Sequence, residues 1–551
     1  MLKKMNDDLA KLSFPMRFIS LLNTKTATVI CILIAVSCRI VNVLFVSFIG
    51  RDKIILMQQS RNLLEGKGLS IARYFIQNTE TPVYDYTPFW PPGYPMLLAP
   101  FLKIFDYDVY WATTSLDLIF AVAFIFLVRK IVIELNFPAA AVNIMTLVAG
   151  CFDYAFISKS LPTDIPAFVL FLVGLLMFIR IIKNEKFQGL HLFLASIFLF
   201  LPCTFRYSYP PLSIGVPLAV IFLGWHLKRG MLRKKGFISL VIVSALVITF
   251  LVLLKNLTGS AGYIVDTGRG FFPENFIHWT PFVTESFINR IFSTSQLINK
   301  TGISVRQSLR ILELLSAGLS IGLIIVFFLL FFKKNFFKQG SYFSNFLLIG
   351  FIISAATCAS LIYLTITYKP QPSWGNYLGE PRYFMFINLF LQIAFIGWVF
   401  LYPSWKKSTF QKAVVLIFSL ILFIEITHNI YFHTKVVISP GKYVAPDEEP
   451  DYVYFISVTD SISRSNPDAD ILVVSDNDEF FPLMTNYLGH KGIYDGDNML
   501  KTGPAVNRKT ILILALYDME MAKYQSFLTE RKAQFLNRVG FVNFYKVELL
   551  P

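Results

Sequence analysis

Repeated apolar runs of about 20 residues are the feature that most constrains this chain. A helix needs about 20 apolar residues to cross the hydrocarbon core of a bilayer, and about eleven runs of this kind occur in the sequence. Only 15% of the 551 residues are charged, against about 25% in soluble domains. The sequence therefore predicts a polytopic α-helical membrane protein. The predicted spans are 26–48, 113–130, 138–157, 163–182, 189–204, 211–227, 237–254, 311–332, 343–367, 383–402 and 412–432.

The distribution of Lys and Arg predicts the orientation of these spans. Basic residues are concentrated in alternate connections, and the short connections between them hold only Lys159, Arg206, Lys369 and Arg382. Because basic residues are retained on the cytoplasmic side, segment 1–25 is predicted to be a cytoplasmic tail. The net charge of +15 is then explained by the basic residues of the cytoplasmic connections. Nucleic acid is not an expected partner. We expect a multi-pass protein of the inner (plasma) membrane.

The cysteines do not indicate a disulfide framework. All five lie in or beside apolar runs, without the loop pairing of a secreted scaffold or the spacing of a metal site. The first apolar run is also too long for a signal peptide, so we interpret it as an uncleaved helix. The cysteines are Cys31, Cys38, Cys151, Cys203 and Cys358.

Two outer loops and a polar tail complete the predicted organisation. The loops cover about 50–112 and 255–310, and helical spacing at 54–65 predicts an amphipathic helix lying on the membrane surface. Residues 440–551 are polar and predict a small α/β domain. An odd number of spans places this domain on the extracytoplasmic side. Its expected strands are 471–475, 510–516 and 542–549, with a helix over 519–539.

Polar side chains gather at the predicted outer ends of the spans. An ionisable group at membrane depth is costly, so each is a candidate functional residue. Each also has a structural alternative, because basic side chains reach toward the interface, aromatic residues form interfacial belts, and Asp164 before Pro166 suits a helix start. The candidates are the carboxylates Asp52 and Asp164, the cations Lys159, Arg206 and Arg382, and the aromatic residues Tyr86, Trp90, Tyr207 and Tyr383.

These residue types suit the transfer of a group from a lipid phosphate. Arg and Lys bind phosphate through charge-assisted hydrogen bonds and stabilise the charge that develops on a leaving phosphate. A carboxylate can act as general base toward an incoming hydroxyl group. Aromatic side chains offer flat faces to a sugar ring. One general base without a second carboxylate close to it favours a single displacement, which inverts the anomeric configuration of the sugar.

An ordered set of motifs resembles the C-type glycosyltransferase superfamily. The set is most similar to bacterial membrane proteins related to protein O-mannosyltransferases and lipid A aminoarabinose transferases, and it covers about residues 26–432. Its members are Asp52 after the first span, Leu64-Glu65-Gly66-Lys67-Gly68, Pro91-Pro92-Gly93-Tyr94-Pro95, Thr163-Asp164, Phe205-Arg206-Tyr207 and Pro381-Arg382-Tyr383.

The resemblance implies a polyprenyl-phosphate-sugar donor used on the extracytoplasmic face. It implies that Asp52 is the catalytic or metal-linked carboxylate, that Asp164 is the second acidic residue, and that Arg206 and Arg382 hold the donor phosphate. The acceptor would be a glycan, a lipid or a protein. Membrane lipids are expected as further partners of the protein.

Two departures from the family pattern qualify these roles. Lys53 stands where the mannosyltransferases have a second acidic residue, which favours Asp52 as a base over a metal ligand, although a divalent metal stays an alternative. Phe89 and Trp90 stand where the aminoarabinose transferases have a lysine, so the phosphate contact is expected at Lys159 or Arg73.

Two other functions fit part of the pattern. A lipid-linked saccharide transporter or flippase would carry charges near the bilayer midplane, where Arg39 is the clear charged residue. An O-antigen-type ligase or polymerase would place its large outer loop late in the chain, whereas the most distinctive loop here follows the first span. The transferase therefore accounts for more of the sequence than either alternative.

The predicted topology can be tested separately from function. A periplasmic reporter such as alkaline phosphatase, fused after residue 440, should be active, and a cytoplasmic reporter at the same position should be silent. The same pair fused after residue 235, in a strongly basic connection, should give the opposite pattern. Equal signals from both fusion points would contradict the alternation of spans.

Overall fold

The computed structural model describes residues 20–45, 51–75, 77–86, 90–151, 163–184, 188–258, 270–272, 341–367, 384–401, 409–438, 450–475, 480–493, 506–518 and 521–549. The chain divides into two compact units. The first, called the helical unit, contains Met1–Val43, Asp117–Ser158 and Thr163–Lys435. The second, called the mixed unit, contains Leu44–Leu116, Lys159–Pro162 and Val436–Pro551.

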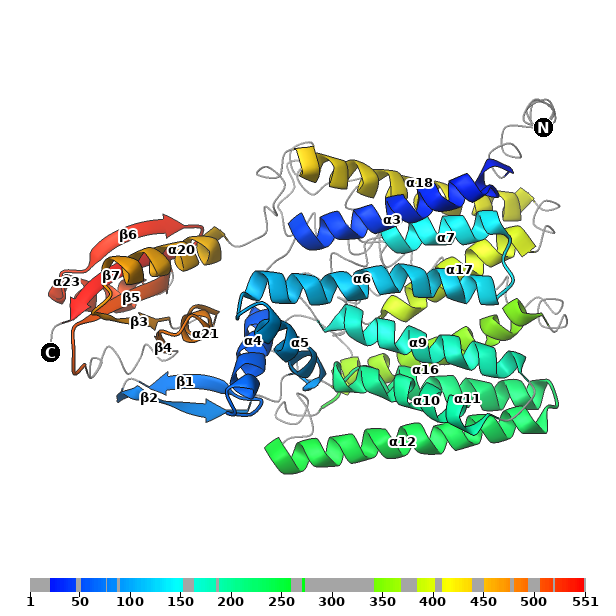
Figure 1. Ribbon diagram of the computed structural model, residues 1–551, viewed down its shortest axis with the longest axis horizontal. Helices are drawn as coiled ribbons and strands as arrows, with labels where there is room; N and C mark the ends of the chain where they lie inside the picture. Colours follow the sequence, from blue (N-terminus) through cyan, green and yellow to red (C-terminus); the bar gives the residue numbers. More distant parts are fainter. Residues whose placement is uncertain are drawn as a thin grey trace. The chain divides into compact units, whose positions relative to one another are not determined.

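Long apolar helices make up the helical unit (Figure 1). Among the described residues, the five helices α3, α9, α12, α16 and α18 are long and apolar enough to cross a membrane, and α7, α10, α11 and α17 are shorter apolar helices. Helices overlap ten of the predicted spans; span 311–332 lies outside the described residues, so the total of eleven stays a prediction. The bounds are α3 Lys25–Phe45, α6 Val109–Glu134, α7 Ala139–Cys151, α9 Asp164–Lys183, α10 Gly189–Phe200, α11 Pro210–His226, α12 Gly230–Thr258, α16 Tyr342–Thr367, α17 Met385–Leu401 and α18 Thr409–Ile438.

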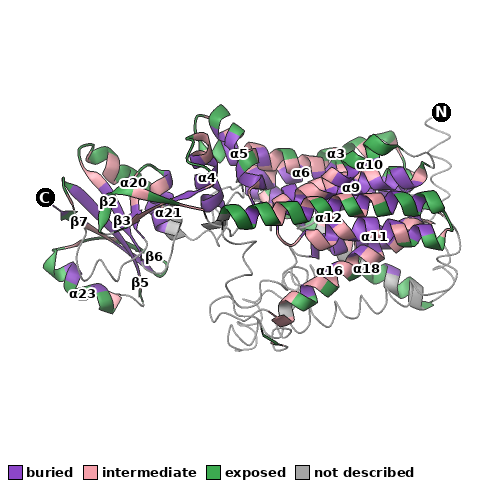
Figure 2. Ribbon diagram, turned by 90° about the horizontal axis from the view of Figure 1, so that it is seen from below, coloured by how far each residue is buried: buried purple, intermediate pink, exposed green. Residues whose placement is uncertain are grey.

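Close helix crossings hold this unit together. Helix α11 packs against both α12 and α16, and α10 packs against α9 and α12. Where α16 meets α17, a Cβ atom at Gly350 would lie 2.1 Å from the ring of Phe390. Small residues let helix backbones approach closely, which supplies the packing contacts that drive association in an apolar solvent. In Figure 2 the residues of α9 and α11 are largely buried.

Three of the basic connections meet at one end of the helical unit. Glu134, at the end of α6, accepts hydrogen bonds from Arg180 at 3.1 Å and Lys183 at 3.0 Å, both in the last turn of α9. The Nζ atom of Lys235 in α12 donates to the carbonyl oxygen of Asn184 at 2.6 Å. The alternation of basic and non-basic connections thus corresponds to two ends of the unit, and the assignment of one end to the cytoplasm stays a prediction.

A five-stranded sheet forms the centre of the mixed unit. Its strand order is β4-β3-β5-β7-β6, with β3 parallel to β4 and β5, and with β7 antiparallel to β5 and β6. The predicted strands 471–475, 510–516 and 542–549 correspond to β3, β5 and β7. The bounds are β3 Asp470–Val474, β4 Lys491–Ile493, β5 Thr510–Tyr517, β6 Gln534–Val539 and β7 Val542–Leu549.

Helices cover both faces of the sheet. Residues of β5 alternate between two cores, so its continuous apolar run Thr510–Tyr517 is buried on both sides, as expected of a central strand. One core includes Phe455 of α20 (Pro450–Ser465) and Phe481 of α21 (Phe480–Tyr487). The other includes Tyr524 of α23 (Met521–Glu530).

The first long loop is part of the same unit as the sheet. It contains α4 (Arg51–Leu64), the hairpin of β1 (Ile71–Phe75) and β2 (Asn78–Asp85), and α5 (Gly93–Ile104). Ile54 and Ile55 of α4 and Ile71 of β1 belong to the core that β3 and β5 share with α20 and α21. Residues separated by about four hundred positions therefore share one core.

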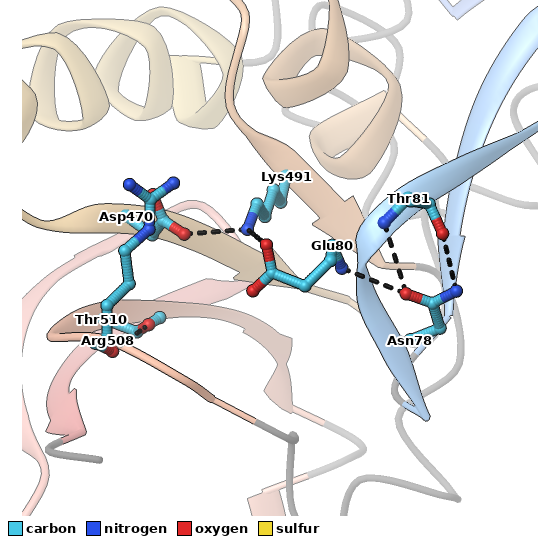
Figure 3. A network of polar contacts seen from close by, with 7 residues as sticks. All are labelled: Asn78, Glu80, Thr81, Asp470, Lys491, Arg508 and Thr510. Atoms are coloured by element: carbon cyan, nitrogen blue, oxygen red, sulfur yellow. Dashed lines mark hydrogen bonds and ion pairs between the residues drawn. The ribbon is translucent and has the colours of Figure 1, made fainter.

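Polar contacts reinforce this packing. The guanidinium group of Arg61 in α4 donates to the carbonyl oxygen of Tyr487, and the side-chain amide of Asn486 donates to the carbonyl oxygen of Ala72 at 2.9 Å. Figure 3 shows a second link, in which Lys491 lies 2.7 Å from Asp470 of the sheet and 3.6 Å from Glu80 of the hairpin.

Two predicted elements of the mixed unit were wrong in part. The helix expected at 54–65 is present as α4, but residues 53–60 are all buried, and its isoleucines pack in the sheet core rather than on a membrane surface. The helix expected over 519–539 ends at Glu530, because Lys532 adopts a φ of +49° and the chain continues as β6, paired with β7. The hairpin β1–β2 and α5 were not predicted.

Asp470 should make the stability of the sheet depend on pH. Burial opposes ionisation, but hydrogen bonds from Lys491 and Arg508 prevail and hold the pKa of Asp470 below its usual range. The folded pKa lies below the unfolded value of about 3.9, so the stabilisation is complete above that value and is lost as the pH falls through the folded pKa. Asp470→Asn should lower the hydrogen-exchange protection factors of β3 at pH 7 and change them less at pH 3.

The ion pair of Lys546 and Glu548 supplies the control for this prediction. It lies in the same sheet at 2.8 Å, but the Glu548 side chain is 53% exposed, and exposed pairs contribute little. Glu548→Gln should leave the protection of β3 unchanged at both pH values. An equal effect of the two substitutions would contradict the role assigned to Asp470.

Candidate functional site

A buried ion pair joins two of the predicted site residues in the helical unit. The Nε atom of Arg206 lies 3.3 Å from Oδ1 of Asp164, and the side chains are only 3% and 2% exposed. A terminal guanidinium nitrogen of Arg206 also lies 3.4 Å from the hydroxyl oxygen of Thr163. The structure therefore brings together a cation and a carboxylate that are separated by about forty residues in the sequence.

Local structure places the two side chains. Asp164 is the first residue of α9, where a negative charge interacts favourably with the helix dipole. Arg206 lies in the turn between the 3₁₀ segment Leu201–Thr204 and α11. Its backbone N–H donates to the carbonyl oxygen of Pro202 at 3.0 Å, and its own carbonyl oxygen accepts from Tyr209 at 3.3 Å. This backbone turn fixes the point from which the guanidinium group reaches α9.

Helix α9 separates the pair from the basic end of the helical unit. Its 20 residues correspond to about 30 Å at 1.5 Å per residue, with Asp164 at one terminus and Lys183 at the other. The ion pair thus lies at the end that the charge pattern assigns to the outer side. A buried charge is retained at such a place only when it is paired, because desolvation of an unpaired ion is costly.

Pairing bears on the role of Asp164. The Oδ1 atom of Asp164 faces the guanidinium group of Arg206, so that oxygen is not available to take a proton from an acceptor. The arrangement suits Asp164 as a group that orients Arg206. The two residues are a matched pair rather than two independent candidates.

The sequence interpretation gave no role to two residues beside the ion pair. Thr163 contacts Arg206 directly, and Tyr209 is buried within electrostatic range of Asp164 and Arg206. The ring of Tyr209 also packs edge-on against Phe171 of α9 at a centroid distance of 6.4 Å. The position of Tyr209 directly before Pro210, at the start of a helix, was the available signal. Tyr207, which was predicted, is half-buried.

Other predicted residues belong to the mixed unit. Asp52 is the second residue of α4, and the adjacent Lys53 is buried. Tyr86 directly follows β2; its hydroxyl oxygen is buried and has no hydrogen-bond partner among the described residues, and burial raises the pKa of Tyr86 to about 12. Trp90 is half-buried and lies shortly before α5. Tyr86 thus presents a buried hydroxyl group that a ligand could satisfy.

The remaining predicted positions divide into two groups. Lys159, Arg382 and Tyr383 lie outside the described residues. Arg73, the alternative phosphate contact, lies on β1 with its Nε atom 3.7 Å from Asp85 across the hairpin. In the part of the chain that the structure describes, no three His, Cys, Asp or Glu side chains converge as metal ligands.

Comparison with known proteins gives distant structural similarities. No protein-family model and no curated protein sequence matches the chain. The chain is similar to the oligosaccharyltransferase AglB of Archaeoglobus fulgidus, solved with an inhibitory peptide and a dolichol-phosphate, at 13% identity over 93% of this chain and 72% of that one, with a TM-score of 0.46. It is also similar to ArnT of Cupriavidus metallidurans bound to undecaprenyl phosphate, at 12% identity over 94% and 97%, with a TM-score of 0.44. Similarities of this size carry no argument about chemistry.

The buried ion pair predicts a characteristic pattern of stability. Arg206→Met or Asp164→Leu alone should lower the free energy of unfolding by about 3–5 kcal/mol, because each removes the ion-pair partner of a buried charge. The double variant should recover most of that loss, since two apolar side chains leave no charge. Unfolding of the detergent-solubilised protein by SDS titration measures both quantities. Losses that simply add in the double variant would show that the two side chains do not act as a pair.

Proposed function

We propose that this protein is a membrane glycosyltransferase that moves a sugar from a polyprenyl-phosphate donor to an acceptor on the extracytoplasmic face. The observation that carries the proposal is the buried cation Arg206, held by Asp164 at the end of the helical unit opposite the basic connections. A fixed cation at that depth suits the phosphate of a lipid whose chain lies in the bilayer. The ordered sequence motifs around Asp52, Asp164, Arg206 and Arg382 support the same class.

Arg206 would stabilise the leaving phosphate. As the bond between the sugar and the phosphate breaks, negative charge grows on the phosphate oxygens, and a cation already in place stabilises it without reorganisation. Asp164 holds the guanidinium group at the Nε atom of Arg206. Asp164 is therefore proposed as a positioning residue rather than as a second catalytic carboxylate. Lys159 and Arg382 are proposed as further phosphate contacts on the strength of the sequence.

Asp52 would act as the general base. Its carboxylate takes the proton from the acceptor hydroxyl group, and the oxygen attacks the anomeric carbon of the sugar. The carbon–oxygen bond to the donor then breaks, and the polyprenyl phosphate departs with the bonding electrons. One displacement of this kind inverts the anomeric configuration.

Aromatic residues would bind the sugar. Tyr86 offers the buried hydroxyl group without a partner among the described residues, which suits a hydrogen bond to a sugar hydroxyl. Trp90, Tyr207 and Tyr383 are proposed to supply flat apolar faces, since pockets for such ligands combine apolar walls with a few polar anchors.

The contacts of Arg39 bear on the transporter alternative. Its Nε and a terminal nitrogen donate to the carbonyl oxygen of Ala149 at 3.2 Å and 2.6 Å, and its guanidinium carbon lies 5.7 Å from the centre of the Phe124 ring. The charge therefore links α3 to the last turn of α7, where helix carbonyls lack intrahelical partners. A structural role therefore accounts for Arg39, and the transferase stays the better-supported function.

The donor and the base can be tested together. A deletion strain should accumulate the lipid-linked sugar donor, which mass spectrometry would identify. With that donor, purified Asp52→Asn should transfer sugar at least about 100-fold more slowly than the wild type, the usual contribution of a general base. Asp85→Asn serves as the control, because Asp85 is a carboxylate of the same loop that pairs with Arg73, and it should leave the rate within about twofold. Full activity of Asp52→Asn would refute the assignment of the base.

A further inference from the structure

Two cysteines from different helices meet inside the helical unit. The Sγ atoms of Cys38 in α3 and Cys151 in α7 lie 3.7 Å apart, and both side chains are buried. More than one hundred residues separate them in the sequence, and neither lies in a recognisable cysteine motif. Only the packing of α3 against α7 brings the two sulfur atoms together.

The helix crossing explains this short distance. A Cβ atom placed on Gly150 would lie 2.3 Å from both Cα and Cβ of Ala35, so the two backbones pass each other in close contact. Cys38 follows Ala35 by one helical turn, and Cys151 is the residue after Gly150. A disulfide has a sulfur–sulfur bond of about 2.05 Å, so closure requires the two atoms to approach by roughly 1.7 Å. Because the backbones are already close, side-chain rotation covers much of that change.

Charged and basic groups surround Cys38. Arg39, the next residue, is buried and bonded to the carbonyl oxygen of Ala149. His433 of α18 lies within electrostatic range of the Cys38 thiol, and its Nδ1 atom lies 2.7 Å from the carbonyl oxygen of Asn429. A carbonyl oxygen only accepts, so Nδ1 carries a proton, and in the neutral ring Nε2 is an acceptor. Cys38 thus has a base and a cation beside it, and a second thiol within contact distance.

We propose that Cys38 and Cys151 form a peroxide-oxidised thiol pair that closes into a reversible disulfide between α3 and α7. Cys38 is the attacking thiol and Cys151 the resolving thiol. A small uncharged peroxide suits this place, because the pair is buried in an apolar bundle that a bulky or charged oxidant could not enter. Neither sulfur belongs to the site proposed for sugar transfer.

The chemistry occurs in two balanced steps. The sulfur of Cys38 attacks one oxygen of hydrogen peroxide, and the O–O bond breaks. His433 transfers the thiol proton to the departing oxygen, which leaves as water, and Cys38 becomes a sulfenic acid. The sulfur of Cys151 then attacks that of Cys38, the S–O bond breaks, and a second water leaves with the Cys151 proton. In total, two thiols and one hydrogen peroxide give one disulfide and two waters.

The position of the pair indicates what the bond would constrain. Helix α3 leads along the chain into α4, which carries Asp52, and α7 leads toward Asp164 at the start of α9. A disulfide between α3 and α7 would therefore fix, relative to each other, the two helices that precede these carboxylates. Reduction by a thiol would release them.

Peroxide treatment of the purified full-length protein tests this proposal. After brief exposure to hydrogen peroxide, the remaining thiols are alkylated in denaturant, and the peptides are identified by mass spectrometry. Cys38 and Cys151 should lose alkylation together, about tenfold faster than Cys203, as expected for an activated thiol beside a resolving one. A peptide pair linked through Cys38 and Cys151 should appear, and dithiothreitol should remove it.

Cys203 is the matched control within the same chain. It is equally buried, but its Sγ atom lies 3.4 Å from the hydroxyl oxygen of Ser213 rather than beside a second sulfur. In Cys151→Ser, Cys38 should instead stop at a sulfenic acid that dimedone traps, and in Cys38→Ser, Cys151 should react no faster than Cys203. Size-exclusion chromatography checks that both variants stay folded. Equal reactivity of all three cysteines in the wild type, or a disulfide that involves Cys203, would overturn the proposal.

Discussion

The shared core between the first loop and the C-terminal sheet is the constraint on which the mixed unit depends. Ile54, Ile55 and Ile71 are buried in one core with Ile471 and Phe544. These side chains leave water only when the two distant segments meet, and burial of such residues is worth roughly 1.5–3 kcal/mol each. It follows that the loop that carries Asp52 and the C-terminal sheet must lie on the same side of the membrane, whichever side that is.

Charges inside the helical unit are governed by a second constraint, the cost of desolvation. Arg206 pairs with Asp164, and Arg39 donates to the carbonyl oxygen of Ala149. Both arginines therefore have partners supplied by another helix, as the cost of burying an ion requires. The two arginines differ in position: Arg39 links α3 to α7, whereas Arg206 is held at the terminus of α9.

The candidate site was predictable in part. Asp164 and Arg206 were found from the sequence because ionisable residues are rare beside apolar spans, but their pairing was not, because nothing local links positions so far apart. Tyr209 was missed for the same reason, since its significance comes from burial beside the pair. The helix expected at 54–65 is present as α4, which begins at Arg51 and so includes Asp52, yet it packs in a sheet core rather than on a membrane surface. Helical spacing shows that a helix has an apolar face, but it does not identify what that face contacts.

The sequence by itself determined the apolar helices, the separation of basic from non-basic connections, and the main strands of the tail, because these depend on hydrophobicity, charge and periodicity over short windows. The tertiary structure decided which of those elements meet. It joined the first loop to the sheet, paired Arg206 with Asp164, and brought Cys38 to Cys151. The physical reason is that close packing selects contacts by shape and by the pairing of buried polar groups, and neither property can be read from residues in sequence order.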